Sequence, residues 1–297
     1  MIRRAWLNCR GHVSPRTLLR VAVRPLSLTI IAAILLGATT GELFTHAGEG
    51  NSVVVGNTGG TLSSVIQLDN RLIVFGGGNA RSDLADLFGR STVPWRRHID
   101  LLILPGWDNQ QALGAIGLLE HVNVTEIVIL GQPSTETIWN VLLQSASSHA
   151  VPVTVLSGKN RIALGPDAQI QLFAAPPSGT TPSGFALMTL QYEQVQVAFL
   201  DASSAGLSEL TASDADIDRA HLLVLTRPFY PQTIRSVLEM QPPAEKTTEV
   251  GDETATYSRE IRAGQHVAVQ LSGAGLRISL GSLQLVGAGS PTSATSN

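Results

Sequence analysis

The sequence has few of the residues that build disulfide frameworks, thiolate metal sites or charged surfaces. Its 297 residues include a single cysteine, Cys9, so neither an internal disulfide nor a cysteine-based metal site can form. Charged residues make up only 14% of the chain and aromatic residues only 5%, whereas 43% of residues are hydrophobic. The length suits one large α/β domain or two small ones.

Acidic residues are absent from the first 41 positions, while six arginines lie among the first 24. The stretch "PLSLTIIAAILLGATTG" (Pro25–Gly41) that follows carries no charge. As a helix it would be roughly 26 Å long, close to the ~30 Å hydrocarbon core of a bilayer. We therefore predict a basic cytoplasmic segment at 1–24 and a transmembrane signal anchor at 25–44. A cleaved signal peptide and a buried core helix are the alternatives.

The arginines also predict the orientation of the chain. Basic residues before the anchor keep the N-terminus in the cytoplasm, so we expect a single-pass cell-membrane protein whose C-terminal domain is extracytoplasmic. After Gly41, 14 basic residues against 23 acidic ones give a net charge of −9. Domains that bind nucleic acids usually carry positive charge, so a nucleic-acid partner is not expected. The local run Arg96-Arg97-His98 is interpreted as a solvated turn before a strand.

The rest of the chain alternates between β-like runs and helical patterns. We predict a linker at 45–51, one domain at 52–287 and a disordered tail at 288–297. Asp69-Asn70 and Glu193-Gln194 are hairpin turn signals, and the strand–helix alternation between them predicts a partly parallel, buried sheet. Gly89 is expected to end the first helix and Ser134 to cap the third. Helices are expected at 81–90, 109–122, 134–149, 204–213 and 231–240, and a mobile loop at 241–260.

One stretch, "LLILPGWDNQQALGA" (Leu101–Ala115), is placed where an α/β enzyme often carries catalytic groups. A buried strand opens there into a loop and then a helix. The loop offers one carboxylate, from Asp108, and three amides, from Asn109, Gln110 and Gln111.

Three longer stretches together carry a resemblance to a known family. They are "GNTGGTLSSVIQLDNRLIVFGGG", "IDLLILPGWDNQQALGAIGLLEHVNVTEIVIL", and "FALMTLQYEQVQVAFLDAS" followed by "DIDRAHLLVLTRPFYP". Their order resembles the metallo-β-lactamase fold, and most of all the extracytoplasmic domain of ComEC-type DNA-uptake (competence) proteins. The resemblance implies an α/β fold, an αββα four-layer sandwich of metallo-β-lactamase type, and a site for zinc or manganese.

The metal ligands that the resemblance implies are missing from the first loop. In the family, a His-x-His-x-Asp-His loop follows the strand. Laid on this chain, the two histidines of His-x-His fall on Gly106 and Asp108, and the Asp-His pair falls on Gln110 and Gln111. Among these four residues only Asp108 could ligate a cation, because glutamine amides are weak, neutral ligands.

The other ligand positions have changed as well. The aspartate of the family's opening turn falls on Phe75, its bridging aspartate falls on Asp201, and its final histidine loop falls near Arg227. None of the seven histidines is paired at ligand spacing. A catalytic zinc site needs about three protein ligands plus an open position for water. The six residues Gly106, Asp108, Gln110, Gln111, Asp201 and Arg227 are therefore interpreted as a vestigial site, with no catalytic residue, no metal and no cofactor.

The expected function follows from the anchor and the altered ligand loops. We expect a membrane-anchored, catalytically inactive domain that acts in binding or scaffolding, with the membrane and an unidentified protein as partners. The alternative is a metal-dependent hydrolase of the same superfamily, a nuclease or phosphodiesterase, with an altered site around Asp108 and Asp201.

Overall fold

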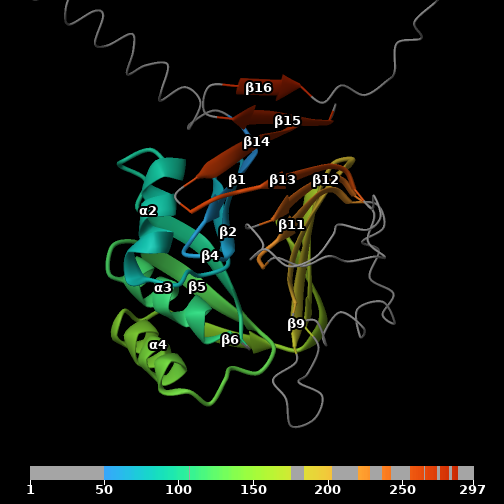
Figure 1. Ribbon diagram of the computed structural model, residues 1–297. Helices are drawn as coiled ribbons and strands as arrows, with labels where there is room; N and C mark the ends of the chain where they lie inside the picture. The colour runs from blue at the N-terminus through green and yellow to red at the C-terminus, as the bar shows by residue number, and fades with distance from the viewer. Residues whose placement is uncertain are drawn as a thin grey trace, which may run out of the picture. The chain divides into compact units, whose positions relative to one another are not determined.

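A computed structural model of the chain describes residues 50–106, 108–174, 184–202, 220–227, 236–241, 255–263, 265–272, 275–280 and 283–286 (Figure 1). The chain divides into Met1–Glu49 and Gly50–Asn297, and every described residue lies in the second part. The predicted cytoplasmic segment, anchor and tail, and the helix expected at 204–213, therefore lie outside the described residues. Within these described ranges, no helix is long and apolar enough to cross a membrane.

The described strands form two sheets. The first has nine strands, in the order β16-β15-β14-β1-β2-β3-β4-β5-β6. In chain order its strands are β1 (Ser52–Asn57), β2 (Leu62–Leu68), β3 (Arg71–Phe75), β4 (His98–Pro105), β5 (Asn123–Leu130), β6 (Val153–Leu156), β14 (His266–Ser272), β15 (Gly275–Leu280) and β16 (Leu283–Val286).

The second sheet has seven strands, in the order β13-β12-β11-β10-β9-β8-β7. They are β7 (Gly158–Ala163), β8 (Ala168–Ala174), β9 (Phe185–Tyr192), β10 (Val195–Ala202), β11 (Ala220–Leu225), β12 (Ser236–Gln241) and β13 (Ala255–Glu260).

Both predicted hairpins are confirmed. β2 and β3 are antiparallel around Asp69 (φ 52°), and β9 and β10 are antiparallel around Glu193 (φ 50°). Aspartate tolerates this left-handed backbone better than most residues other than glycine, whereas glutamate has no such preference. The predicted parallel stretch is confirmed too, because β3, β4, β5 and β6 pair in parallel. β14 then pairs with β1, which brings the end of the domain back to its beginning.

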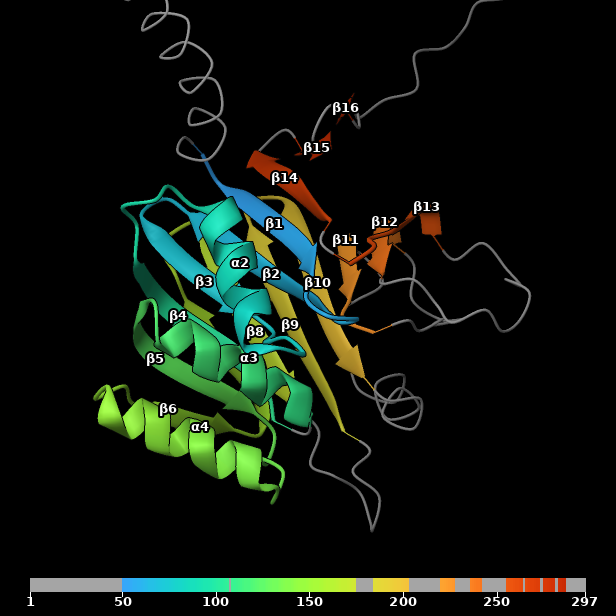
Figure 2. The same cartoon turned by 60° about the vertical axis from the view of Figure 1, so that its left-hand side comes forward.

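Three helices cover one face of the first sheet: α2 (Arg81–Ser91), α3 (Asn109–Leu119) and α4 (Thr137–Ser148). Figure 2 shows them lying over β2–β6, with the second sheet behind. Two predicted helix ends are wrong. α2 continues past Gly89, which has open space around it, and Glu136 rather than Ser134 precedes the first turn of α4.

The apolar side chains fill two layers. Alternate residues of β1, such as Val53 and Val55, are buried between the two sheets, where the rings of Phe75 and Phe199 lie 5.6 Å apart. Val54, on the opposite face of β1, packs in the layer beneath the helices together with Trp139 of α4. This alternation is the two-residue period of a strand whose two faces are both covered.

Two expectations for the last third of the domain are wrong. The helix expected at 231–240 is replaced over its last part by β12, and the loop expected at 241–260 contains β13. Leucine, glutamate and methionine favour helices, but here parallel pairing of β12 with β11 and β13 decides the structure. Glu239 and Met240 are buried as a result. The described residues thus form a mixed α/β sandwich of two sheets with one helical layer, which is consistent with the metallo-β-lactamase fold.

Candidate functional site

The ends of three strands carry the predicted site. β4 ends at Pro105, just before Asp108, while Asp201 is the penultimate residue of β10 and Arg227 follows β11 closely. β10 and β11 are parallel neighbours, so Asp201 and Arg227 lie at the same edge of the second sheet. A hydrogen bond from Leu62 N to Thr226 O, 2.8 Å long, ties this edge to β2 of the first sheet.

Gly106 takes part in the site through its backbone alone. Its N–H donates to Leu130 O at 2.8 Å and its carbonyl accepts from Ser134 N at 3.0 Å. A β-carbon at this position would lie 2.7 Å from Ile129 Cγ2 and 2.9 Å from Gly131 O, closer than real contacts allow. Close packing therefore explains a glycine at the position where the resemblance would place a histidine.

Asp108 and Gln111 belong to the first turn of α3. Asp108 is the N-cap residue, and its Oδ1 accepts from Gln110 N at 3.1 Å, which stabilises the beginning of the helix. Gln111 is fully buried; its Nε2 lies 3.3 Å from Asp108 Oδ2 and 3.5 Å from Asp201 Oδ2. The side chain of Gln110 is exposed, so this predicted site residue does not join the cluster.

The orientation of the Gln111 amide follows from its neighbour Gly77. Gly77 N–H, which can only donate, is hydrogen-bonded to Gln111 Oε1. The amide oxygen therefore faces Gly77 and the amide nitrogen faces the two carboxylates. In this arrangement Gln111 supplies the site with a donor and has no oxygen left for a cation.

Glycines allow α3 to approach this turn closely. A β-carbon on Gly77 would lie 1.9 Å from Gln111 O, and one on Gly117 would lie 1.9 Å from Arg81 O. A β-carbon on Gly114 would come within 2.7 Å of the Gly77 carbonyl carbon. The run Gly76-Gly77-Gly78 thus lets the backbone of the turn contact the backbone of the helix, and this contact holds Gln111 in place.

Arg227 supplies the positive charge of the cluster. Its Nη2 forms an ion pair with Asp108 Oδ2, and its Nε lies 3.6 Å from Asp201 Oδ1. Asp201 is completely buried and Asp108 is 6% exposed, whereas the side chain of Arg227 is 32% exposed. One guanidinium therefore reaches in from a half-buried position and lies against two buried carboxylates, although its single charge balances only one of them.

The two carboxylates differ in how far they are removed from water. Burial raises the pKa of Asp201 from 3.8 to about 7, although the charge of Arg227 opposes the rise; the charge of Asp108 adds to it. Asp201 Oδ1 makes no hydrogen bond within the described part of the chain. Near neutral pH, Asp201 therefore exists in both the charged and the protonated form.

Neither Phe75 nor the described histidines supply a metal ligand at the positions that the resemblance implies. Phe75, at the position of the first aspartate, is fully buried between the sheets against Phe199. The histidines that the structure describes have separate environments. His98 lies near Asp100, His149 contacts Ser145 O at the end of α4, and His221 Nδ1 accepts from Gln196 N.

A catalytic zinc or manganese ion does not fit this set of residues. Among the described residues, no three His, Cys, Asp or Glu side chains lie together as a metal site would require. Two carboxylates are present, but their oxygens already face the Arg227 guanidinium and the Gln111 amide nitrogen. Structural and catalytic zinc sites use about three or four nitrogen, sulfur or oxygen ligands.

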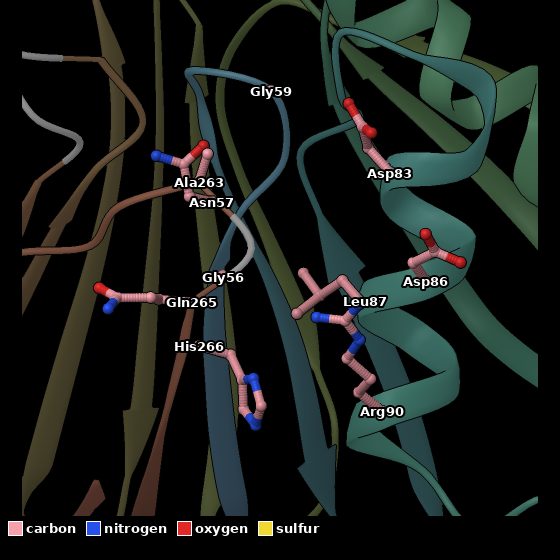
Figure 3. A pocket seen from close by; sticks show the side chains of 10 residues that line it. All are labelled: Gly56, Asn57, Gly59, Asp83, Asp86, Leu87, Arg90, Ala263, Gln265 and His266. Atoms are coloured by element: carbon pink, nitrogen blue, oxygen red, sulfur yellow. The ribbon is translucent and has the colours of Figure 1, made fainter. Parts of the chain in front are cut away.

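A separate cavity of about 190 Å³ lies between α2 and the ends of β1 and β14 (Figure 3). Two of its polar side chains have structural roles. Asp83 accepts from Ala80 N at the beginning of α2, and Asn57 donates to Ile261 O. None of the predicted site residues lines this cavity.

The structure brings four of the six predicted site residues together. Asp108, Gln111, Asp201 and Arg227 lie together, whereas Gly106 and Gln110 contribute only backbone groups. The bridging role of Gln111 was not predicted. A glutamine at an otherwise apolar helical position, near a run of three glycines, was the available signal.

The structure is similar to several solved proteins at low sequence identity. One is a metallo-β-lactamase-fold protein, YhfI from Bacillus subtilis, with 17% identity and a TM-score of 0.40 over 59% of this chain and 71% of that chain. Another is the Rm3 metallo-β-lactamase, with 17% identity and a TM-score of 0.40 over 60% of this chain and 76% of that one. A third is zinc-bound PqqB from Methylobacterium extorquens, with 13% identity and a TM-score of 0.40 over 59% of this chain and 72% of that one.

No protein-family model matches the chain, and no curated protein matches it by sequence. The two-sheet sandwich described above is what makes the chain consistent with the metallo-β-lactamase fold.

Proposed function

We propose that this chain is a catalytically inactive, membrane-anchored relative of metallo-β-lactamase-fold domains, similar to the extracytoplasmic domain of ComEC-type proteins, and that it acts in binding or scaffolding. The observation that carries the proposal is the position of Arg227. Its guanidinium pairs with Asp108 and Asp201 at the place where the resemblance would put a metal ion.

Charge balance explains why this cluster supports a structural role. Two buried carboxylates need a positive partner, and a guanidinium supplies charge together with several fixed donors. A hydrolytic metal ion would instead hold a water molecule and lower its pKa to about 7. A guanidinium has no free coordination position and cannot generate such a nucleophile.

The test measures metal content and hydrolysis on the purified full chain. After incubation with zinc or manganese and desalting, we expect well under one ion per chain. We also expect no phosphodiester cleavage above that of a matched Asp108→Ala, Asp201→Ala double variant. Stoichiometric metal, or cleavage that the double variant abolishes, would overturn the proposal.

One observation favours the alternative, a hydrolase with an altered site. The pKa of Asp201, raised by burial to about 7, suits a general base at neutral pH. In that case Asp201→Asn alone would abolish hydrolysis, whereas Asp108→Asn would retain part of it. The complete burial of Asp201 is the evidence against this role, since a base must reach the proton that it removes.

Anchoring and orientation complete the proposal. The uncharged run Pro25–Gly41 after six arginines supports a signal anchor, with the described domain outside the cytoplasm and an envelope protein as its partner. The test is flotation of the full chain with vesicles, followed by protease digestion of intact cells. Recovery of the chain in the aqueous fraction, or protection of the domain from external protease in cells with a single membrane, would contradict it.

A further inference from the structure

One end of the first sheet carries an exposed tryptophan among arginines. Trp95 is 75% exposed, more than any other large hydrophobic side chain that the structure describes. Arg71, the first residue of β3, and Arg97, just before β4, are also exposed. We call these three residues, Arg71, Trp95 and Arg97, the Trp95 surface.

Hydrogen bonds join this surface to the point where the chain enters the domain. Arg96 Nη2 donates to Asn70 O at 2.6 Å, which fixes the loop after α2 against the β2–β3 turn. Asp69 N donates to Asn51 Oδ1 at 2.5 Å, which fixes that turn against the residue before β1. Figure 2 shows the loop after α2 and the beginning of β1 at the same end of the sheet.

The proposed anchor limits how far this end can lie from a membrane. Only residues 45–49 separate the anchor predicted at 25–44 from Gly50. At ~3.3–3.6 Å per residue, five residues span at most about 18 Å. An anchor at this position would hold the end of the sheet with Asn51 near the bilayer surface, and the opposite end, where β4 leads to Asp108, could face away from it.

We infer that the Trp95 surface rests on the headgroups of an anionic bilayer. Tryptophan, like tyrosine, is enriched at membrane–water interfaces, because its ring is apolar and its N–H is polar. Each arginine or lysine near an anionic surface contributes ~1 kcal/mol of attraction. Asp69 is the exposed acid on the same turn, while Asp100 is half-buried and accepts from Leu72 N.

The charge of the whole domain makes this local surface distinctive. Residues after Gly41 carry a net −9, so a bilayer of anionic lipid repels the domain as a whole. The three arginines at 71, 96 and 97 reverse that sign locally, at the end that the anchor holds close. The inference rests on the proposed anchoring, because the anchor is the reason to expect a lipid surface at this site rather than a nucleic acid or a protein.

The experiment places a fluorescent label next to the surface in the full chain. Cys9 is replaced by serine, and a single cysteine is introduced at exposed Asn70 or, as the control, at Val155, which is 51% exposed near the other end of the sheet. The chain is reconstituted in vesicles of phosphatidylcholine and phosphatidylglycerol in equal parts. Quenching is then compared between a lipid-attached quencher and iodide in the buffer.

We expect the label at position 70 to be quenched from the lipid and the label at position 155 to be quenched from the buffer. Arg97→Ala should reduce the equilibrium constant for docking about fivefold, the equivalent of ~1 kcal/mol, and replacing phosphatidylglycerol by phosphatidylcholine should reduce it further, because all three arginines then lose their anionic partner. Trp95→Ala should act in the same direction. Lys159→Ala, which removes an exposed cation from β7 in the second sheet, should have no effect.

Each other outcome has a defined meaning. Equal quenching from the buffer at positions 70 and 155 in vesicle-anchored chain overturns the inference, as does a change at position 70 that requires an added oligonucleotide. If the full chain fails to float with vesicles, the anchoring proposal fails separately. The Trp95 surface is then tested by adding anionic vesicles and measuring how much chain they retain, with and without Trp95→Ala. If the vesicles retain no chain, the inference is overturned.

Discussion

The two ends of the first sheet differ in whether their charged side chains are buried or exposed. At the end where β4 finishes, Asp108 lies buried beside Asp201 of the second sheet, and Arg227 supplies a positive charge to both from within the chain. At the end where β3 and β4 begin, Arg71 and Arg97 are exposed around Trp95. Buried charge has to be balanced inside the fold, whereas exposed charge remains available to a partner. The first end is therefore expected to determine stability, and the second end to determine where the domain docks.

The largest expected effect is the loss of Arg227. Arg227→Ala leaves two carboxylates without their cation, and removing one partner of a buried ion pair costs about 3–5 kcal/mol. Urea unfolding at pH 8, where Asp201 is ionised, measures the change. Arg227→Lys, which keeps the charge, should lose less stability. In the Arg227→Ala, Asp201→Asn double variant the loss should be smaller than in Arg227→Ala alone. Unchanged stability in Arg227→Ala would show that the cluster is not what holds this end together.

A second effect concerns pH. The pKa of Asp201 is about 7 in the folded chain and near 3.8 in the unfolded chain, so the unfolded chain releases this proton first as pH rises. The contribution of Asp201 to stability therefore falls between about pH 4 and pH 7. At ~1.4 kcal/mol per pKa unit, the fall is at most about 4 kcal/mol.

Asp201→Asn removes this titration. We expect the variant to be more stable than the wild type at pH 8, and the difference between the two to disappear below pH 4. Unfolding free energies measured at several pH values give the comparison. Parallel pH profiles for the two proteins would contradict the assignment.

The third effect tests the close glycine contact between α2 and α3. Gly117→Ala would place a β-carbon 1.9 Å from Arg81 O, so α2 and α3 must separate. Overpacking of this kind costs about 1–3 kcal/mol. Gly89→Ala is the matched control, because Gly89 lies in α2 with nothing near it and alanine favours a helix by about 0.5–1 kcal/mol. Similar effects of the two substitutions would show that the glycine contact is unimportant.

The smallest expected effect on stability is at the other end of the sheet. Trp95 and Arg97 are exposed, so Trp95→Ala and Arg97→Ala should change the free energy of unfolding by no more than about 0.5 kcal/mol. Thermal unfolding compares them with Arg227→Ala under the same conditions. A large loss in Trp95→Ala would mean that its ring supports the fold, and the contrast between the two ends would fail.

Much of the fold could be predicted from local patterns. The turns at Asp69 and Glu193, the parallel strands from β3 to β6 and the three helices each have a signal within a short window of sequence. β12 could not be predicted, because Leu238, Glu239 and Met240 are common in helices and only pairing with β11 and β13 makes them a strand. β13 was missed for the same reason, since its pairing partner is β12.

The candidate site, like the fold, could be predicted only in part from local sequence. The sequence predicted Asp108, Gln111, Asp201 and Arg227 as residues of one site, in segments at or after strand ends, but it left their mutual contacts open. Gln111 bridges the two carboxylates because the glycine turn at Gly77 admits the backbone of α3. No pattern within α3 alone predicts that contact.

By itself, the sequence determined which chemistry is present at the ligand positions, since a glycine, two glutamines and an arginine cannot act as imidazoles in any conformation. It also determined the turns and the strand periods, which depend on neighbouring residues. Only the tertiary structure decided that Arg227 meets both Asp108 and Asp201. These residues lie far apart in the chain, and pairing within the two sheets, together with the link between the sheets from Leu62 to Thr226, brings them together.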